Sequence, residues 1–174
     1  MENGLVHIYC GNGKGKTTAS VGLAVRAKGA GLSVLFIQFI KGQNSSELLP
    51  LKNIGIEIAR TPKEIGFIPF MDENEKQDCF EEQQKLINMA QESSKSGEYD
   101  LIILDEILGA IETEMVELNQ VVDLISYRLK TVEIVLTGRN APKELVEIAD
   151  YVSKIKEVKH PYNNNQKARK GIEF

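Results

Sequence analysis

The chain has 174 residues, a length typical of one domain with one sizeable core, so we expect a single domain over residues 1–174. Hydrophobic residues make up 42% and charged residues 26%, which excludes a disordered chain, and no apolar run is long enough to predict a membrane span. The net charge of −4 argues against a broad nucleic-acid-binding surface. No secretory signal is visible, and Cys10 and Cys79 lack metal-site spacing, so we expect a cytoplasmic protein with reduced thiols.

Strand-like and helix-like segments alternate along the chain. In chain order, the pattern predicts a strand over Leu5–Cys10, a helix over Thr17–Lys28, strands over Val34–Ile40 and Ile54–Ala59, a loop over Thr61–Asp72, a helix over Asn74–Ser94, a strand over Tyr99–Asp105, a helix over Leu118–Lys130, a strand over Glu133–Thr137, a helix over Ala141–Ala149, a strand over Tyr151–Val158, and a polar tail with a turn at residues 163–165. This alternation predicts an α/β fold of three α/β/α layers with a mostly parallel central sheet. Ligands of such sheets bind at the carboxyl ends of the strands.

The strongest local signal follows the first predicted strand and opens the first predicted helix. It is the run Gly11-Asn12-Gly13-Lys14-Gly15-Lys16-Thr17-Thr18. Glycines allow backbone N–H groups to turn toward phosphate oxygens, and the start of the helix adds the positive end of its dipole. The lysine of such a loop supplies a mobile positive charge, and the hydroxyl after it is a ligand for Mg²⁺. The run therefore predicts a phosphate-binding loop, although Cys10 stands where the general pattern has its first glycine.

A second signal is the apolar segment Leu101–Leu104, which ends in the carboxylates Asp105 and Glu106. A strand that ends in carboxylates beside a phosphate loop is the pattern that holds Mg²⁺. Because adjacent strand residues point to opposite faces, the two carboxylates should have different roles, and at least one should face the metal. Alone, this pattern is equally typical of a solvated strand end.

Together with three further stretches, the loop and the carboxylate pair resemble the corrinoid adenosyltransferases of the cobalamin-biosynthesis type. The three stretches are Gln38–Gly42, Leu136–Pro142, and Ala149–Val152 continued through Lys159–Pro161 and Lys170–Glu173. The resemblance covers nearly the whole chain, and the family's own loop has the same three-glycine form. It implies the RecA-like P-loop NTPase variant of the α/β fold.

The resemblance also implies a reaction, in which the Co(I) of a reduced corrinoid attacks the 5′ carbon of ATP and triphosphate leaves. ATP is expected to lie reversed in the loop compared with P-loop hydrolases, since the reacting atom belongs to the ribose. The implied ligands of triphosphate and ribose are the loop residues Gly11, Asn12, Gly13, Lys14, Gly15, Lys16, Thr17 and Thr18. Gln38, Lys41 and Arg139 are implied to line the cleft, and Thr17, Asp105 and Glu106 to hold Mg²⁺. The implied catalytic residues are Lys16, Thr17 and Glu106. For Arg139, the alternative role is a salt bridge at the surface.

The loop around Phe67 matches the place where the family presents aromatic side chains to the corrin, where they help to displace the lower axial ligand. Pro69 stands where a relative has tryptophan, and Phe70 follows it. Ordinary core packing is the alternative reading of both phenylalanines. Some relatives carry an additional N-terminal helix over the site, so we expect a site that is more open here or covered by a partner subunit. The family further implies a homodimer and a flavoprotein reductant.

Two other functions fit the same loop. A P-loop NTPase or small-molecule kinase would use the loop and the carboxylates equally well and would yield ADP. A non-catalytic carrier or sensor would bind ATP and corrinoid without adenosyl transfer.

Overall fold

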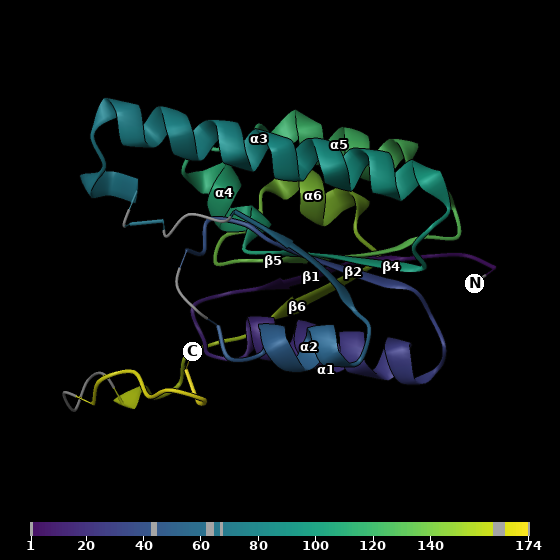
Figure 1. Cartoon of the computed structure of the whole chain (residues 1–174), viewed down its shortest axis with the longest axis horizontal. Helices are drawn as coiled ribbons and strands as arrows, with labels where there is room; N and C mark the ends of the chain where they lie inside the picture. The colour runs from purple at the N-terminus through teal and green to yellow at the C-terminus, as the bar shows by residue number, and fades with distance from the viewer. Residues whose placement is uncertain (1, 43–44, 62–64, 67, 162–165, 174) are drawn as a thin grey trace.

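The computed structural model describes residues 2–42, 45–61, 65–66, 68–161 and 166–173, and in these residues strands and helices alternate as predicted (Figure 1). The strands are β1 (Val6–Cys10), β2 (Val34–Gln38), β3 (Glu57–Arg60), β4 (Leu101–Asp105), β5 (Glu133–Thr137) and β6 (Tyr151–Lys154). The helices are α1 (Lys16–Gly29), α2 (Leu48–Asn53), α3 (Glu73–Ser96), α4 (Ile107–Glu112), α5 (Leu118–Tyr127) and α6 (Lys143–Ile148), with a 3₁₀ turn, η1, at Ile68–Phe70.

The strands form one sheet in the described residues, in the order β3-β2-β4-β5-β1-β6, and every neighbouring pair is parallel. Helices α3, α4, α5 and α6 cover one face of this sheet, and α1 and α2 cover the other (Figure 1). Both faces are therefore shielded from water, which is why β2 and β4 are buried at every position and read as continuous apolar runs. The three-layer α/β/α prediction is confirmed, and the sheet is wholly parallel.

Two apolar cores lie on opposite faces of the sheet. Successive residues of a strand point to opposite faces, so Phe36 packs in the core beneath α1 and α2 while Ile37 packs in the larger core beneath α3 and α5. Helix α3 begins with a capping box in which Asp72 and Glu75 satisfy each other's backbone N–H groups. It ends at Gly97 in the left-handed conformation. These caps fix both ends of a long helix that lies along one face of the sheet (Figure 1).

The sequence patterns missed three short elements. The α2 and α4 helices have only six residues each, too few for a helical period to show, and η1 lies in the segment predicted as a loop. Pro50 argues against a helix by its type, yet it stands in the first turn of α2, where a missing N–H costs nothing.

Several predicted elements end earlier than expected, and β2, predicted to reach Ile40, ends at Gln38. Helix α5 ends at Tyr127 because Arg128 is extended, and β6 ends at Lys154 where the chain leaves its neighbour β1. The predicted turn at 163–165 lies outside the described residues. Both cysteines are buried free thiols. None of the described helices has the length and apolar character needed to cross a bilayer.

Candidate active site

The loop between β1 and α1 is shaped by two glycines with different constraints. Gly11 has φ 114° and Gly15 has φ 116°, backbone angles that residues with a side chain rarely adopt. A Cβ atom on Gly11 would lie 2.3 Å from the carbonyl oxygen of Ile155, whereas one on Gly15 would meet nothing within 4 Å. Gly11 therefore serves a close approach between the loop and the chain after β6, and Gly15 serves only the turn into the helix.

The first half of the loop is hydrogen-bonded to other loops at the same edge of the sheet. The N–H of Gly11 donates to the Arg139 carbonyl at 2.8 Å, and the N–H of Gly13 donates to the Ile155 carbonyl at 3.0 Å. The side-chain oxygen of Asn12 accepts a hydrogen bond from the N–H of Glu157 at 3.2 Å. Because the N–H groups of Gly11 and Gly13 are already bonded, the groups left to bind a phosphate are the N–H groups at the start of α1, which have no partner within the helix.

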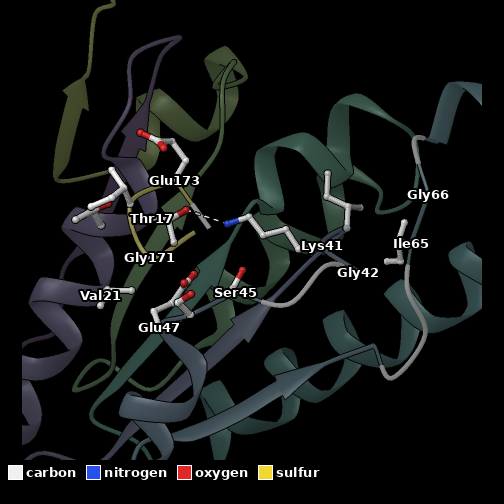
Figure 2. Close-up of a pocket in the computed structure, with 14 residues that line it drawn as sticks. Thr17, Val21, Lys41, Gly42, Ser45, Glu47, Ile65, Gly66, Gly171 and Glu173 are labelled. Atoms are coloured by element: carbon white, nitrogen blue, oxygen red, sulfur yellow. Dashed lines mark hydrogen bonds between the residues drawn. The ribbon is translucent and has the colours of Figure 1, made fainter. Parts of the chain in front are cut away.

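The buried carboxylate of Asp105 is the centre of the hydrogen-bond network at the strand ends. One of its oxygens accepts from the hydroxyls of Thr17 at 2.9 Å and Thr137 at 2.8 Å, and the other accepts from Lys41 Nζ at 2.8 Å. Lys41 Nζ also donates to the Thr17 hydroxyl at 3.0 Å, as the dashed line in Figure 2 shows. The carboxylate at the end of β4, the phosphate loop and the segment after β2 thus meet at one point.

Glu106 lies just beyond the end of β4, so the alternation of strand side chains does not apply to it. Its backbone has φ 60° at the start of α4, and its N–H donates to the Thr137 hydroxyl at 2.9 Å. Burial raises the pKa of the Glu106 carboxyl, while the positive charges of Lys41, Lys16 and Arg139 act in the opposite direction. The side chain therefore lies within reach of these positive charges but is poorly solvated.

Lys16 has a corresponding perturbation. Its Nζ donates to the Gly13 carbonyl at 2.9 Å. Burial lowers the pKa of its ammonium group, the charge of Arg139 adds to that effect, and the charge of Glu106 opposes it. Arg139 is exposed, and its charge acts on both Lys16 and Glu106. Opposite charges that perturb one another in this way are typical of functional sites.

A cavity of about 680 Å³ opens beside this network. It is lined by Thr17 and Thr18 of the phosphate loop and by the segment after β2 that includes Lys41 (Figure 2). Ile65, Gly66 and the C-terminal residues Gly171–Glu173 also line it. Lys14 forms a salt bridge with Glu173 at 3.0 Å, which ties the phosphate loop to the end of the chain. The resemblance included this tail, but the sequence did not predict where the tail lies. Its contact with the phosphate loop joins residues more than 150 positions apart.

Two predicted cleft residues, Gln38 and Arg139, are not among the residues that line this cavity. Gln38 does not line this cavity but is fully buried behind it, with its amide nitrogen 3.4 Å from the Asp105 carboxylate. Its side-chain oxygen has no hydrogen-bond partner among the described residues. Phe67 lies outside the described residues, while Phe70 in the same loop has 86% of its surface exposed.

The wholly parallel sheet and the loop–carboxylate pairing place the chain in the phosphate-loop class of α/β proteins. The profile of the family described as ATP:corrinoid adenosyltransferase BtuR/CobO/CobP matches residues 2–174, and the chain belongs to this family. The corrinoid adenosyltransferase of Escherichia coli K12 is 33% identical, with 99% of this chain and 87% of that protein covered. Those of Pseudomonas aeruginosa, with 85% of that protein covered, and Salmonella typhimurium, with 87%, are 31% and 30% identical over 99% of this chain.

A solved structure supports the fold alone. The EssC protein (ATPases 2 and 3) of Geobacillus thermodenitrificans superposes with a TM-score of 0.50 at 16% identity. The match covers 98% of this chain and 35% of the longer EssC chain. A likeness at this identity concerns the arrangement of strands and helices, and it adds nothing about the substrate.

Proposed function

We propose that this chain transfers the 5′-deoxyadenosyl group of ATP to the Co(I) of a reduced corrinoid and releases triphosphate. The observation that carries the proposal is the junction of Thr17, Lys41 and Asp105 beside a large cavity, in a chain of the ATP:corrinoid adenosyltransferase family. In this reaction the cobalt–carbon bond forms as the bond between the 5′ carbon and the triphosphate oxygen breaks. Both electrons of the new bond come from cobalt, so no general base is required.

The protein's task is then to position two substrates and to stabilise the leaving triphosphate. The N–H groups at the start of α1 and the ammonium of Lys16 would bind phosphate oxygens, with Lys14, Thr18 and Arg139 around them. Since the charge of Arg139 acts on Lys16 and Glu106, it is suited to a developing negative charge nearby. The cavity beside Thr17 and Lys41 has room for the nucleoside and for access of the corrin.

The oxygen atoms at this site fit Mg²⁺. Glu106 offers a carboxylate, a hard donor that this ion prefers, whereas the Thr17 hydroxyl and the Asp105 carboxylate are hydrogen-bonded to the Lys41 ammonium. The described residues contain no group of three or more His, Cys, Asp or Glu side chains able to hold a metal. A magnesium ion here would therefore take its remaining ligands from phosphate oxygens and water, as is common for nucleotide-bound magnesium. When bound, it neutralises charge on the triphosphate.

Several parts of the proposal concern partners. A reduced flavoprotein is proposed as the source of electrons for Co(I), and a homodimer as the assembly, both from the family resemblance. A cytoplasmic location follows from the same reasoning. Phe67 and Phe70 are proposed to contact the corrin, because Ile65 and Gly66 of the same loop line the cavity.

An anaerobic assay with chemically reduced cobalamin and MgATP tests the reaction. We expect light-sensitive adenosylcobalamin and triphosphate in a one-to-one ratio, and Lys16→Ala should abolish both. Lys28→Ala, at the far end of α1, is the matched control and should retain activity. ADP or phosphate without adenosylcobalamin would instead establish a kinase or NTPase. Saturable binding of ATP and corrinoid without turnover would establish a carrier or sensor.

A further inference from the structure

The segment that carries Lys41 leaves β2 through an unusual backbone conformation. Ile40 has φ 42°, in the left-handed region that a β-branched residue rarely occupies. Strained residues of this kind persist only where surrounding contacts hold them, and they gather at functional sites. The contacts that hold Ile40 bear on the site, because the next residue, Lys41, places its ammonium group on Thr17 and Asp105.

Three consecutive residues of this segment are hydrogen-bonded to three different elements. The N–H of Phe39 donates to the Asp105 carbonyl at 2.9 Å, which continues the pairing with β4. The N–H of Ile40 donates to the side-chain oxygen of Gln83 at 2.9 Å. The carbonyl of Lys41 accepts from the Arg60 guanidinium at 3.1 Å. Of these anchors, only the Gln83 contact acts on the strained residue itself.

Gln83 belongs to α3, 43 residues along the chain, and its side chain is fully buried. Its amide nitrogen has no hydrogen-bond partner among the described residues. The orientation of the amide is set by the contact, because the Ile40 N–H requires an acceptor. An apolar side chain of the same shape at this position would leave the Ile40 N–H without its acceptor.

The side chain of Ile40 reaches a second part of the site. A Cβ atom on Gly109 of α4 would lie 2.9 Å from Ile40 Cδ1 and 3.5 Å from a Glu106 carboxylate oxygen. Ile40 thus packs onto the first turns of α4 beside Glu106. One backbone position sets both the direction of Lys41 and part of the apolar cover next to Glu106.

We propose that Gln83 is a positioning residue, which holds Ile40 in the left-handed conformation and so directs Lys41 onto Thr17 and Asp105. Its side chain touches none of the groups assigned to the substrates. It acts through the backbone of Ile40, just after the end of β2, and so sets the affinity for MgATP. This part of the inference rests on the proposed function. Without the Gln83 oxygen, Ile40 relaxes to an ordinary conformation and Lys41 leaves the Thr17–Asp105 junction.

Hydrogen exchange tests the tether without reference to nucleotide. Gln83→Met keeps the size of the side chain and removes the acceptor, so peptides covering residues 36–42 should exchange faster. Gln84→Met is the matched control, because Gln84 is the neighbouring glutamine of α3 and bonds instead to the Met115 carbonyl at 2.9 Å. Gln83→Glu keeps an accepting oxygen, and at a pH where this buried carboxyl is protonated it should exchange as the unaltered protein does. Equal exchange in Gln83→Met and Gln84→Met would overturn the proposal.

Binding of MgATP, measured by calorimetry, tests the consequence. Gln83→Met should weaken the Kd roughly tenfold, the scale of one lost hydrogen bond to a charged group, while Gln84→Met leaves it unchanged. The double variant Gln83→Met/Lys41→Met should bind no more weakly than Lys41→Met alone, since Gln83 acts through Lys41. Multiplying losses in the double variant would refute this route.

Failure of the unaltered protein to bind MgATP would contradict the proposed function, while the exchange result still decides the tether. If Gln83→Met does not fold, Gln83→Asn takes its place, because its oxygen falls one methylene short of Ile40.

Discussion

Three glycines near the phosphate loop differ in what an added methyl group would meet. Gly22 is exposed within α1, and a Cβ atom there meets nothing within 4 Å. Gly15 has the same open surroundings but φ 116°, and Gly11 combines φ 114° with a Cβ position 2.3 Å from the Ile155 carbonyl. Alanine at these three positions therefore separates helix propensity, backbone strain, and strain combined with collision.

The expected changes in unfolding free energy follow from these differences. Gly22→Ala should stabilise by about 0.5–1 kcal/mol, because alanine loses less backbone entropy in a helix. Gly15→Ala should cost about 1–3 kcal/mol for the strained conformation. Gly11→Ala carries the same strain and displaces the chain after β6. It thereby weakens the bonds from Gly11 to Arg139 and from Gly13 to Ile155, so we expect at least about 3 kcal/mol.

Thermal unfolding of the three variants without ligand measures this order. At roughly 2–4 °C per kcal/mol for a chain of this size, Gly11→Ala should lower the Tm by about 6–12 °C and Gly22→Ala should raise it slightly. If Gly11→Ala and Gly15→Ala lower the Tm equally, the contact between the loop and Ile155 contributes nothing and the reasoning fails.

Three further variants test the charges of the site. Asp105→Asn leaves Lys41 without its buried partner and should destabilise by about 3 kcal/mol, the lower end of the range for breaking a buried pair, since the Lys41 side chain is 29% exposed. The double variant Asp105→Asn/Lys41→Met should recover part of the Tm in thermal unfolding, and a further loss would contradict the pairing. Burial raises the pKa of Glu106 above its ordinary 4.5, so its effect on stability is most favourable below that value and is lost as pH rises through the folded pKa. Glu106→Gln should therefore gain Tm relative to the unaltered protein as pH increases from about 4 to about 8, while Mg²⁺-dependent ATP binding weakens. Hydrogen bonds from Arg169 and Lys14 lower the pKa of Glu173 from its ordinary 4.5 to about 2. The tail contact therefore persists above pH 4.5 and is lost as pH falls from 4.5 toward about 2. Glu173→Gln should speed hydrogen exchange of residues 166–173 at neutral pH and leave the Tm nearly unchanged, because exposed ion pairs contribute little; a large Tm loss would show that the tail is part of the folded core.

The sequence patterns located the sheet and the phosphate loop because both depend on local signals. The segment Glu133–Thr137 contains the apolar run Ile134–Leu136, and its predicted bounds match β5. The glycine run after β1 also predicted the phosphate loop directly. By contrast, α2 and α4 are too short to show a period, and α2 contains Pro50.

The contacts within the site were less accessible from sequence. Lys41 was predicted to line the cleft, but its bonds to Thr17 and Asp105 join residues 24 and 64 positions away. Gln83 lies on a helix face that reads as ordinary amphipathic packing, so nothing in its local pattern connects it with Ile40. Such pairings arise from the order of strands in the sheet, which local periodicity does not encode.

The position of β1 between β5 and β6 has a consequence for synthesis of the chain. The phosphate loop leaves the ribosome before Arg139 and Ile155, whose carbonyls accept its hydrogen bonds. At about 5–20 residues per second, the carbonyl that holds Gly13 is made roughly 7–30 s after Gly13 itself. A nascent chain of this protein therefore carries its phosphate loop without these hydrogen bonds until the segment after β6 has been made.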